Sequence, residues 1–121
     1  MLQYLMAKKN KKKKEKISPK NEFRINKLDP RKHPVHIFAR AGNDYVFFVI
    51  THSEQTRGVK NIKLHKNPDP RDKDKSYFNP KPRRQRVSSF GNVKTNFVLS
   101  KIDDEKMKPL RFIPTKKERL T

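Results

Sequence analysis

Cysteine and tryptophan are absent from the sequence, and only three of its 121 residues are glycine. Without cysteine the chain has no disulfide framework, no thiolate metal site and no cysteine nucleophile. The glycines, at positions 42, 58 and 91, are too few and too far apart for a phosphate-binding glycine-rich loop. These absences argue against nucleotide hydrolysis, and a cytoplasmic location is the expectation.

Long apolar runs are missing as well. The longest, residues 45–50, is far shorter than the roughly 20 residues that a membrane-spanning helix requires, so no contact with a membrane is expected. Only 31% of the residues are hydrophobic, which is enough for one small domain but not for a large core. We therefore expect part of the chain to be unstructured, and large multi-domain enzymes are excluded.

Negative charge is scarce. Against 32 Lys and Arg residues there are 12 Asp and Glu residues, which gives a formal net charge of +20. A field of this strength attracts polyanions, so nucleic acid is the expected partner. Residues 1–22 include a lysine-rich block with nothing apolar to bury, which predicts a disordered basic arm. The arm is either a solubilising tail or a phosphate-binding segment, and in the second case the contacts are Lys11, Lys12, Lys13 and Lys14.

The clearest structural signal is a hairpin. Residues 35–40 and 45–51 are rich in β-branched and aromatic residues, and Gly42-Asn43 between them suits a tight turn. If Ala41 faces Asp44, the numbers of opposed residues sum to 85 and His33 stands opposite His52. One face of this hairpin is then fully apolar and forms the core: Val35, Ile37, Ala39, Val46, Phe48 and Ile50. The other face mixes aromatic and basic groups: His36, Phe38, Arg40, Tyr45, Phe47, Val49 and Thr51.

A hairpin alone is not stable, so further strands are expected at residues 61–64 and 94–99. One short helix is predicted from 101 to 108, with Ser100 as its cap and Pro109 at its end. The predicted fold is mainly β: a small, partly open SH3-like barrel over residues 23–113. It has one short C-terminal helix and a charged C-terminal tail, 114–121, which we expect to be disordered like the basic arm.

Residues 66–86 combine several prolines with many basic residues, which predicts an extended basic loop within the domain. Arginine pairs with phosphates and stacks on unpaired bases, as aromatic rings do, so the loop is a candidate RNA-binding element. The predicted contacts, with Arg40 added from the hairpin, are Arg40, Arg71, Lys73, Tyr77, Phe78, Lys81, Arg83, Arg84 and Arg86. Alternatively, the two aromatic residues anchor the loop on the domain and its charges are solvated.

No metal site or cofactor is expected. His33 and His36 are three apart on a predicted strand, so they point to opposite faces. Asp69, Asp72 and Asp74 occur in a segment that is interrupted by proline and lacks the turn glycine of a calcium loop.

Cleavage of RNA needs few groups: a base for the 2′-hydroxyl, an acid for the leaving oxygen, and positive charge near the phosphorane. Histidine serves both proton transfers near neutral pH. The predicted hairpin register places His33 opposite His52 and beside Thr51, and Arg57 follows in the next loop, so these four residues are the catalytic candidates. The alternative is that both histidines are ordinary strand-end residues exposed to water.

Four short segments carry a family resemblance: Lys-His-Pro-Val-His-Ile-Phe at 32–38, Phe-Phe-Val-Ile-Thr-His-Ser at 47–53, Thr-Arg-Gly-Val at 56–59 and Asn-Ile-Lys-Leu at 61–64. In this order they resemble the MazF/PemK-type ribonuclease toxins. The resemblance implies an SH3-like barrel, a metal-independent endoribonuclease, an acidic antitoxin as partner and a possible homodimer. It places Thr51 at the family's catalytic hydroxyl position and His33 where the family has an arginine.

That departure leaves two outcomes open, a barrel that cleaves RNA with histidine and one that binds RNA without cleaving it. The family's later Gln-Ile-Arg-Thr-like segment has its nearest counterpart at 99–103, which lacks the arginine. The first expectation is therefore a basic nucleic-acid-binding protein that favours RNA over DNA, because no recognition helix is predicted. An endoribonuclease is the second, and a ribosome-associated structural protein is the third.

Overall fold

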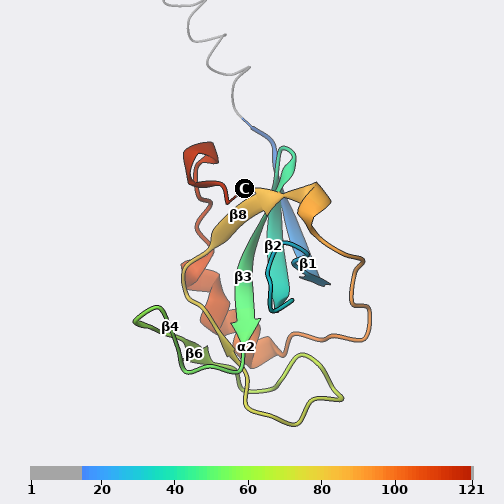
Figure 1. The fold of residues 1–121 in the computed structure, drawn as a ribbon, viewed down its shortest axis with the longest axis vertical. Helices are drawn as coiled ribbons and strands as arrows, with labels where there is room; N and C mark the ends of the chain where they lie inside the picture. The colour runs from blue at the N-terminus through green and yellow to red at the C-terminus, as the bar shows by residue number, and fades with distance from the viewer. Residues whose placement is uncertain (1–14, 121) are drawn as a thin grey trace, which may run out of the picture.

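The computed structural model describes residues 15–120, which form one antiparallel sheet and a small separate hairpin (Figure 1). The sheet contains β1 (Ile17–Ile25), β2 (Pro34–Ala41), β3 (Asp44–Thr51), β6 (Ile62–Lys63), β7 (Tyr77–Phe78) and β8 (Arg83–Arg86). Its order is β1-β2-β3-β7-β6, and β8 pairs with the first half of β3. The separate hairpin joins β4 (Gln55–Thr56) to β5 (Val59–Lys60).

The expected C-terminal helix is present as α2 (Lys101–Met107). The Ser100 hydroxyl accepts a hydrogen bond from the Asp103 amide at 3.1 Å, as a helix cap does, and Pro109 lies in the 3-10 turn that follows the helix. The short 3-10 turns are η1 (Val87–Ser89), η2 (Lys108–Leu110) and η3 (Lys116–Glu118). Among the described residues, no helix is long and apolar enough to cross a membrane.

The sheet remains open. Within residues 15–120 no strand pairing joins β1 to β6, so the described strands do not close into a barrel. The mainly β fold with one short C-terminal helix is confirmed. Of the two further strands expected, the first is present as β6, whereas residues 94–99 form a loop. This loop still packs on the sheet, because the Phe97 ring lies 5.6 Å from the ring of Phe23.

The β2–β3 hairpin forms as expected at its turn but not at its open end. Ala41 faces Asp44, and Gly42 has a φ of +59°, which suits glycine in a tight turn. A bulge between Ile37 and Ala39 then shifts the register, so that Ile37 pairs with Phe47 and Val35 with Val49. A bulge places an extra residue on one strand, and every residue beyond it changes its partner.

This bulge makes the predicted single apolar face wrong. Val35 and Ile37 lie on the opposite face from Phe48 and Ile50, and the sheet has a buried cluster on each side. The first cluster, on which α2 packs through Met107, is Phe23, Phe38, Ala39, Ala41, Val46, Phe48, Ile50, Leu64, Phe78 and Met107. The second is Val35, Ile37, Tyr45, Phe47 and Phe90.

Both predicted tails differ from what the structure shows. Residues 17–22, assigned to the disordered arm, belong to β1, which pairs with β2 along its length. At the other end, the backbone amide of Leu120 donates to the carbonyl of Arg84 at 2.7 Å, which fixes the charged tail beside β8. The expected loop 66–86 is also partly strand, since it contains β7 and β8.

Candidate functional site

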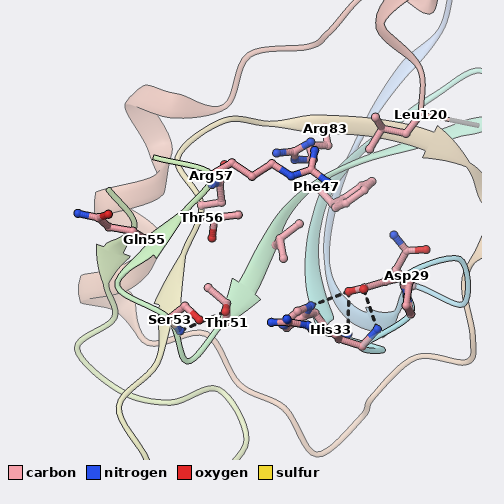
Figure 2. Close-up of a pocket in the computed structure, with 15 residues that line it drawn as sticks. Asp29, His33, Phe47, Thr51, Ser53, Gln55, Thr56, Arg57, Arg83 and Leu120 are labelled. Atoms are coloured by element: carbon pink, nitrogen blue, oxygen red, sulfur yellow. Dashed lines mark hydrogen bonds and ion pairs between the residues drawn. The ribbon is translucent and has the colours of Figure 1, made fainter. Parts of the chain in front are cut away.

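A pocket of about 570 Å³ lies on the face of the sheet that carries Phe47 and Val49. It contains three of the four predicted catalytic residues, His33, Thr51 and Arg57, together with Arg83 of β8 (Figure 2). In this view His33 and Thr51 lie at the lower end of the pocket, and the two guanidinium groups lie at the upper end.

The bulge in β2 explains why His33 faces this pocket. Beyond the bulge the numbers of opposed residues sum to 84, as for Val35 and Val49, and continuing this register sets His33 opposite Thr51. Thr51 shares its face with Val49 because side chains on a strand alternate. The predicted register that pairs His33 with His52 is therefore wrong, and the structure instead brings His33 and Thr51 to the same pocket.

Asp29 holds the His33 side chain. Its carboxylate oxygen Oδ2 lies 2.6 Å from His33 Nδ1 and also accepts the His33 backbone amide at 3.0 Å. Burial acts to raise the pKa of Asp29, but the amides of Arg31 and His33 and the His33 ring together lower the pKa below its usual value. An ionised carboxylate only accepts hydrogen bonds, so Nδ1 carries the proton and Nε2 is the nitrogen available to a ligand.

Thr51 lies at the end of β3 and is largely buried. Its Oγ1 accepts the backbone amide of Ser53 at 3.2 Å, which fixes the hydroxyl oxygen without using its proton. The hydroxyl therefore has a proton to donate into the pocket.

Arg57 reaches the pocket from the two-residue turn between β4 and β5. Both turn residues have positive φ, +49° at Arg57 and +79° at Gly58, as a type I′ turn demands. The arrangement is favourable for glycine but costs energy at arginine, and such strained positions are frequent at functional sites.

Arg83 brings a second positive charge close to Arg57. Burial, together with the charge of Arg57, lowers the pKa of Arg83, which nevertheless remains protonated because arginine ionises far above neutral pH. No carboxylate among residues 15–120 forms an ion pair with either guanidinium. Two cations that share a pocket without a counter-charge form a favourable site for an anion.

His52 lies outside this pocket. As the residue after Thr51 it points to the other side, where its Nε2 lies 2.7 Å from Asp72 Oδ2, and its side chain is 61% exposed. It borders a neighbouring pocket of about 290 Å³, whose lining also includes His33 and Thr51.

The predicted RNA contacts divide into exposed and buried groups. Arg71, Lys73, Lys81 and Arg86 are exposed, whereas Arg40 is half-buried and donates to the Gly42 carbonyl. Lys11, Lys12, Lys13 and Lys14 lie outside the described residues.

Three of the predicted RNA contacts, Tyr77, Phe78 and Arg84, are wrong because their side chains are buried. Phe78 and Arg84 have no exposed surface, and Tyr77 is 8% exposed. The two aromatic residues form β7 and anchor the segment on the sheet, so they offer no face for stacking a base. This matches the alternative in which they hold the loop in place.

Arg84 is instead the centre of a buried ion-pair network. It donates to Asp44 and to Glu15 at 2.6 Å each and to the Pro114 carbonyl at 3.0 Å. The hydrogen bonds to Glu15 raise the pKa of the guanidinium, against the effect of burial. Arg84 therefore connects the N-terminal segment, the sheet and the C-terminal tail, which is a structural role.

Sequence reasoning missed Asp29. An available signal was the Asp29-Pro30 dipeptide, because aspartate before proline favours a turn in which the carboxylate caps nearby amides. The same reasoning placed Arg83 in an RNA-binding loop but not beside Arg57, because that contact depends on how β8 pairs with β3.

Comparison of the chain with protein-family models, with curated proteins and with solved structures found no match in any of the three.

Proposed function

We propose that this protein binds single-stranded RNA and that Arg57 and Arg83 hold one of the phosphates. The observation that carries the proposal is the pair of guanidinium groups in one pocket, neither of them neutralised by a described carboxylate. Guanidinium is the group best suited to phosphate, because its N–H donors match two phosphate oxygens at once. The apolar floor of the pocket strengthens the interaction by excluding water.

Further phosphates are bound by exposed basic side chains around the pocket. Arg71, Lys73, Lys81 and Arg86 are available at the surface, and the lysines of residues 11–14 add the arm to this interface. The net charge of +20 directs RNA to the protein over long range.

RNA is preferred to double-stranded DNA because the described residues offer no helix suited to the major groove. Within residues 15–120 the α-helix is α2, which has seven residues and carries Asp103 and Asp104 in its first turn. Acidic residues at that position repel the phosphates that flank the groove.

The fold that we infer for this interface is a partly open SH3-like barrel. β3 supports this inference because β2 lies on one side of it while β8 and β7 pair in turn with its first half and its end on the other side, which makes β3 the central strand of a small sheet.

Endoribonuclease activity of the MazF/PemK type is the second candidate function. The observation that favours it is the Asp29–His33 pair facing Thr51 and Arg57 across the pocket. His33 Nε2 accepts the proton of the 2′-hydroxyl, whose oxygen attacks the adjacent phosphorus. Thr51 and the two arginines stabilise the phosphorane, the 5′-oxygen leaves and takes a proton from water, and a 2′,3′-cyclic phosphate remains.

Binding and cleavage are measured together by mixing the full chain with fluorescent single-stranded RNA at low salt with a chelator. We expect a mobility shift for the unchanged chain, and an affinity for RNA that is at least tenfold lower in Arg57→Gln and in Arg83→Gln. Lys60→Gln is the matched control, because it removes one exposed positive charge from the hairpin that carries Arg57, at a position outside the pocket and outside the proposed phosphate contacts. Equal losses in all three variants would show that only net charge matters and would refute the pocket.

The same samples decide the second function. Fragments that end in a cyclic phosphate and disappear in His33→Ala would establish the endoribonuclease. Intact RNA in a shifted complex would leave RNA binding as the function.

A further inference from the structure

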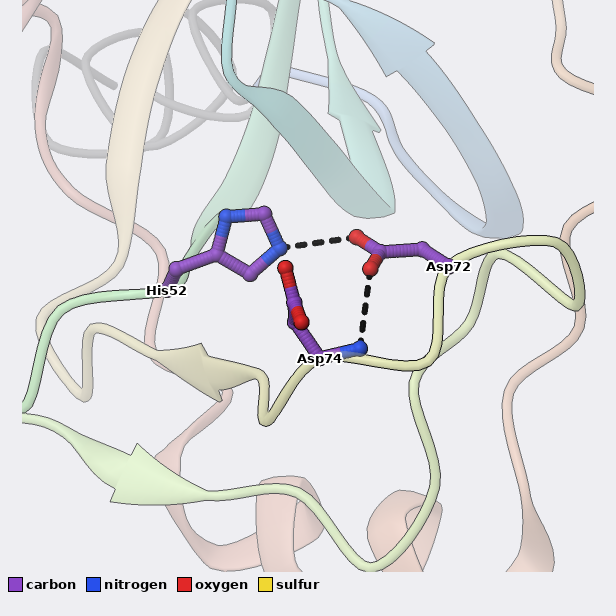
Figure 3. A group of neighbouring side chains, drawn as sticks. All are labelled: His52, Asp72 and Asp74. Carbon is purple, nitrogen blue, oxygen red and sulfur yellow. Dashed lines mark hydrogen bonds and ion pairs between the residues drawn. The ribbon is translucent and has the colours of Figure 1, made fainter.

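His52, Asp72 and Asp74 meet beside the end of β3 (Figure 3). Each offers one ligand atom, and these atoms all lie within 4.8 Å of one another. His52 follows β3 directly, whereas the two aspartates belong to the 64–76 loop. Segments 20 residues apart thus present one imidazole nitrogen and two carboxylate oxygens to a single point.

The loop fixes Asp72 in this position. Its Oδ1 accepts the backbone amide of Asp74 at 3.0 Å, while its Oδ2 faces His52 Nε2. A ligand that is held before the metal arrives loses less freedom on binding.

The charges around the cluster provide a second observation. Basic residues surround the two aspartates along the loop: Lys66, Arg71, Lys73 and Lys75. None of them forms an ion pair with Asp72 or Asp74 within the described chain, although Arg71 approaches Asp69 at 3.8 Å. Elsewhere in this basic protein, carboxylates pair with arginine, as Asp44 and Asp104 do.

We propose that His52, Asp72 and Asp74 bind a divalent first-row transition-metal ion such as Zn²⁺. One imidazole and two carboxylates are a donor set that these ions accept, whereas Mg²⁺ and Ca²⁺ prefer oxygen ligands alone. The metal replaces the hydrogen bond between His52 and Asp72: the imidazole proton moves to Nδ1, and Nε2 and the carboxylates face the ion. Positions not filled by the protein are taken by water.

The site has a consequence for the neighbouring pocket of about 290 Å³, because His52 and Asp72 both line it. A bound ion would fix the loop against the end of β3, one residue from Thr51. This inference does not depend on RNA binding, since its ligands lie outside the pocket of Arg57 and Arg83.

The test is titration calorimetry of the full chain with Zn²⁺, together with the visible absorption of bound Co²⁺. We expect one ion per chain and at least a tenfold loss of affinity in His52→Gln and in Asp74→Asn. We expect the Asp74 variant to disturb the fold less, because hydrogen bonds to described residues use the backbone of Asp74 and not its side chain. Circular dichroism of each variant checks that it is folded.

Two matched controls lie in the same loop. His65→Gln removes an exposed histidine, and Asp69→Asn removes a carboxylate close to the cluster, and neither residue belongs to it. Both variants should bind Zn²⁺ as the unchanged protein does. The proposal is overturned if the controls weaken binding as much as the cluster variants, or if the unchanged chain shows no saturable binding.

Discussion

Arg83 and Arg84 carry the same charge but have different roles, because only one of them is fully buried. Arg83 and Arg84 are neighbours on β8, and their side chains point to opposite faces of the sheet. Arg83 faces the pocket without a carboxylate partner among the described residues, whereas Arg84 is buried and pairs with Asp44 and Glu15. The first is therefore available to a phosphate, and the second stabilises the fold.

Replacing Arg84 with methionine should destabilise the protein by about 3 kcal/mol, since a buried carboxylate left without its main partner is costly. Asp44 would retain only Arg119, which lies 2.9 Å away. Urea denaturation followed by circular dichroism measures the loss. Arg86→Met, at an exposed position on the same strand, should change the free energy of unfolding by less than about 0.5 kcal/mol. Equal effects of the two variants would contradict the role of Arg84.

The buried imidazole of His36 makes the free energy of unfolding depend on pH. Burial lowers its pKa from 6.5 to about 4, and the charge of Arg111 acts in the same direction. Between these values the unfolded chain binds a proton that the folded chain does not, so stability is complete above pH 6.5 and falls as the pH drops towards 4. The loss amounts to about 3 kcal/mol.

Denaturation at several pH values between 7 and 4 tests this dependence. His36→Gln should flatten the slope in that window, because glutamine does not titrate. An unchanged slope in the variant would assign the acid sensitivity to other groups. Asp29 and Asp44, whose pKa values are lowered, lose their stabilising charge only below the usual range of aspartate.

At the scale of secondary-structure elements, two local irregularities build the candidate site. The bulge in β2 turns His33 towards Thr51, and the turn between β4 and β5 carries Arg57 over the same pocket. The bulge lies within the core, because Phe38 belongs to the first buried cluster, whereas the turn is exposed. Each moves one polar side chain to a position that a regular strand would not provide.

Substituting Arg57 in the turn between β4 and β5 should affect the stability of the fold and the binding of RNA in different directions. Arg57→Gly should keep the free energy of unfolding or raise it by up to about 1 kcal/mol, because glycine adopts a positive φ without strain. The same change should weaken RNA binding, since it removes a guanidinium from the pocket. Thermal unfolding and RNA titration of one variant test both statements. A variant that is less stable, or that binds RNA unchanged, would contradict this role of Arg57.

For the whole molecule, the net charge of +20 predicts binding that depends steeply on salt. For single strands, log affinity falls against log salt with a slope of about −0.7 for each phosphate contacted. Because Arg57 and Arg83 hold one phosphate between them, the double variant Arg57→Gln/Arg83→Gln should reduce the steepness of this slope by about 0.7. RNA titrations across a salt series give the slope directly. A slope that the double variant leaves unchanged would place the phosphate contacts elsewhere.

Several features could be predicted from the sequence because they depend on neighbouring residues. Gly42 and Asn43 mark the turn of the hairpin, and Ser100 and Pro109 mark the limits of the helix. The charge, and the polyanionic partner that we propose from it, follow from composition alone. These signals act over a few residues, so no knowledge of the tertiary structure is needed to interpret them.

Only the tertiary structure decided which side chains meet. A regular strand alternates its faces, so the single bulge near Phe38 was enough to shift the register by one residue and to make the predicted core face wrong. The burial of Arg84 and the approach of Asp72 to His52 depend on partners 20 or more residues away. Composition determined that the protein is basic, and the local pattern of residues 35–51 indicated a mainly β fold, whereas long-range packing selected the few charges that remain available at the pocket.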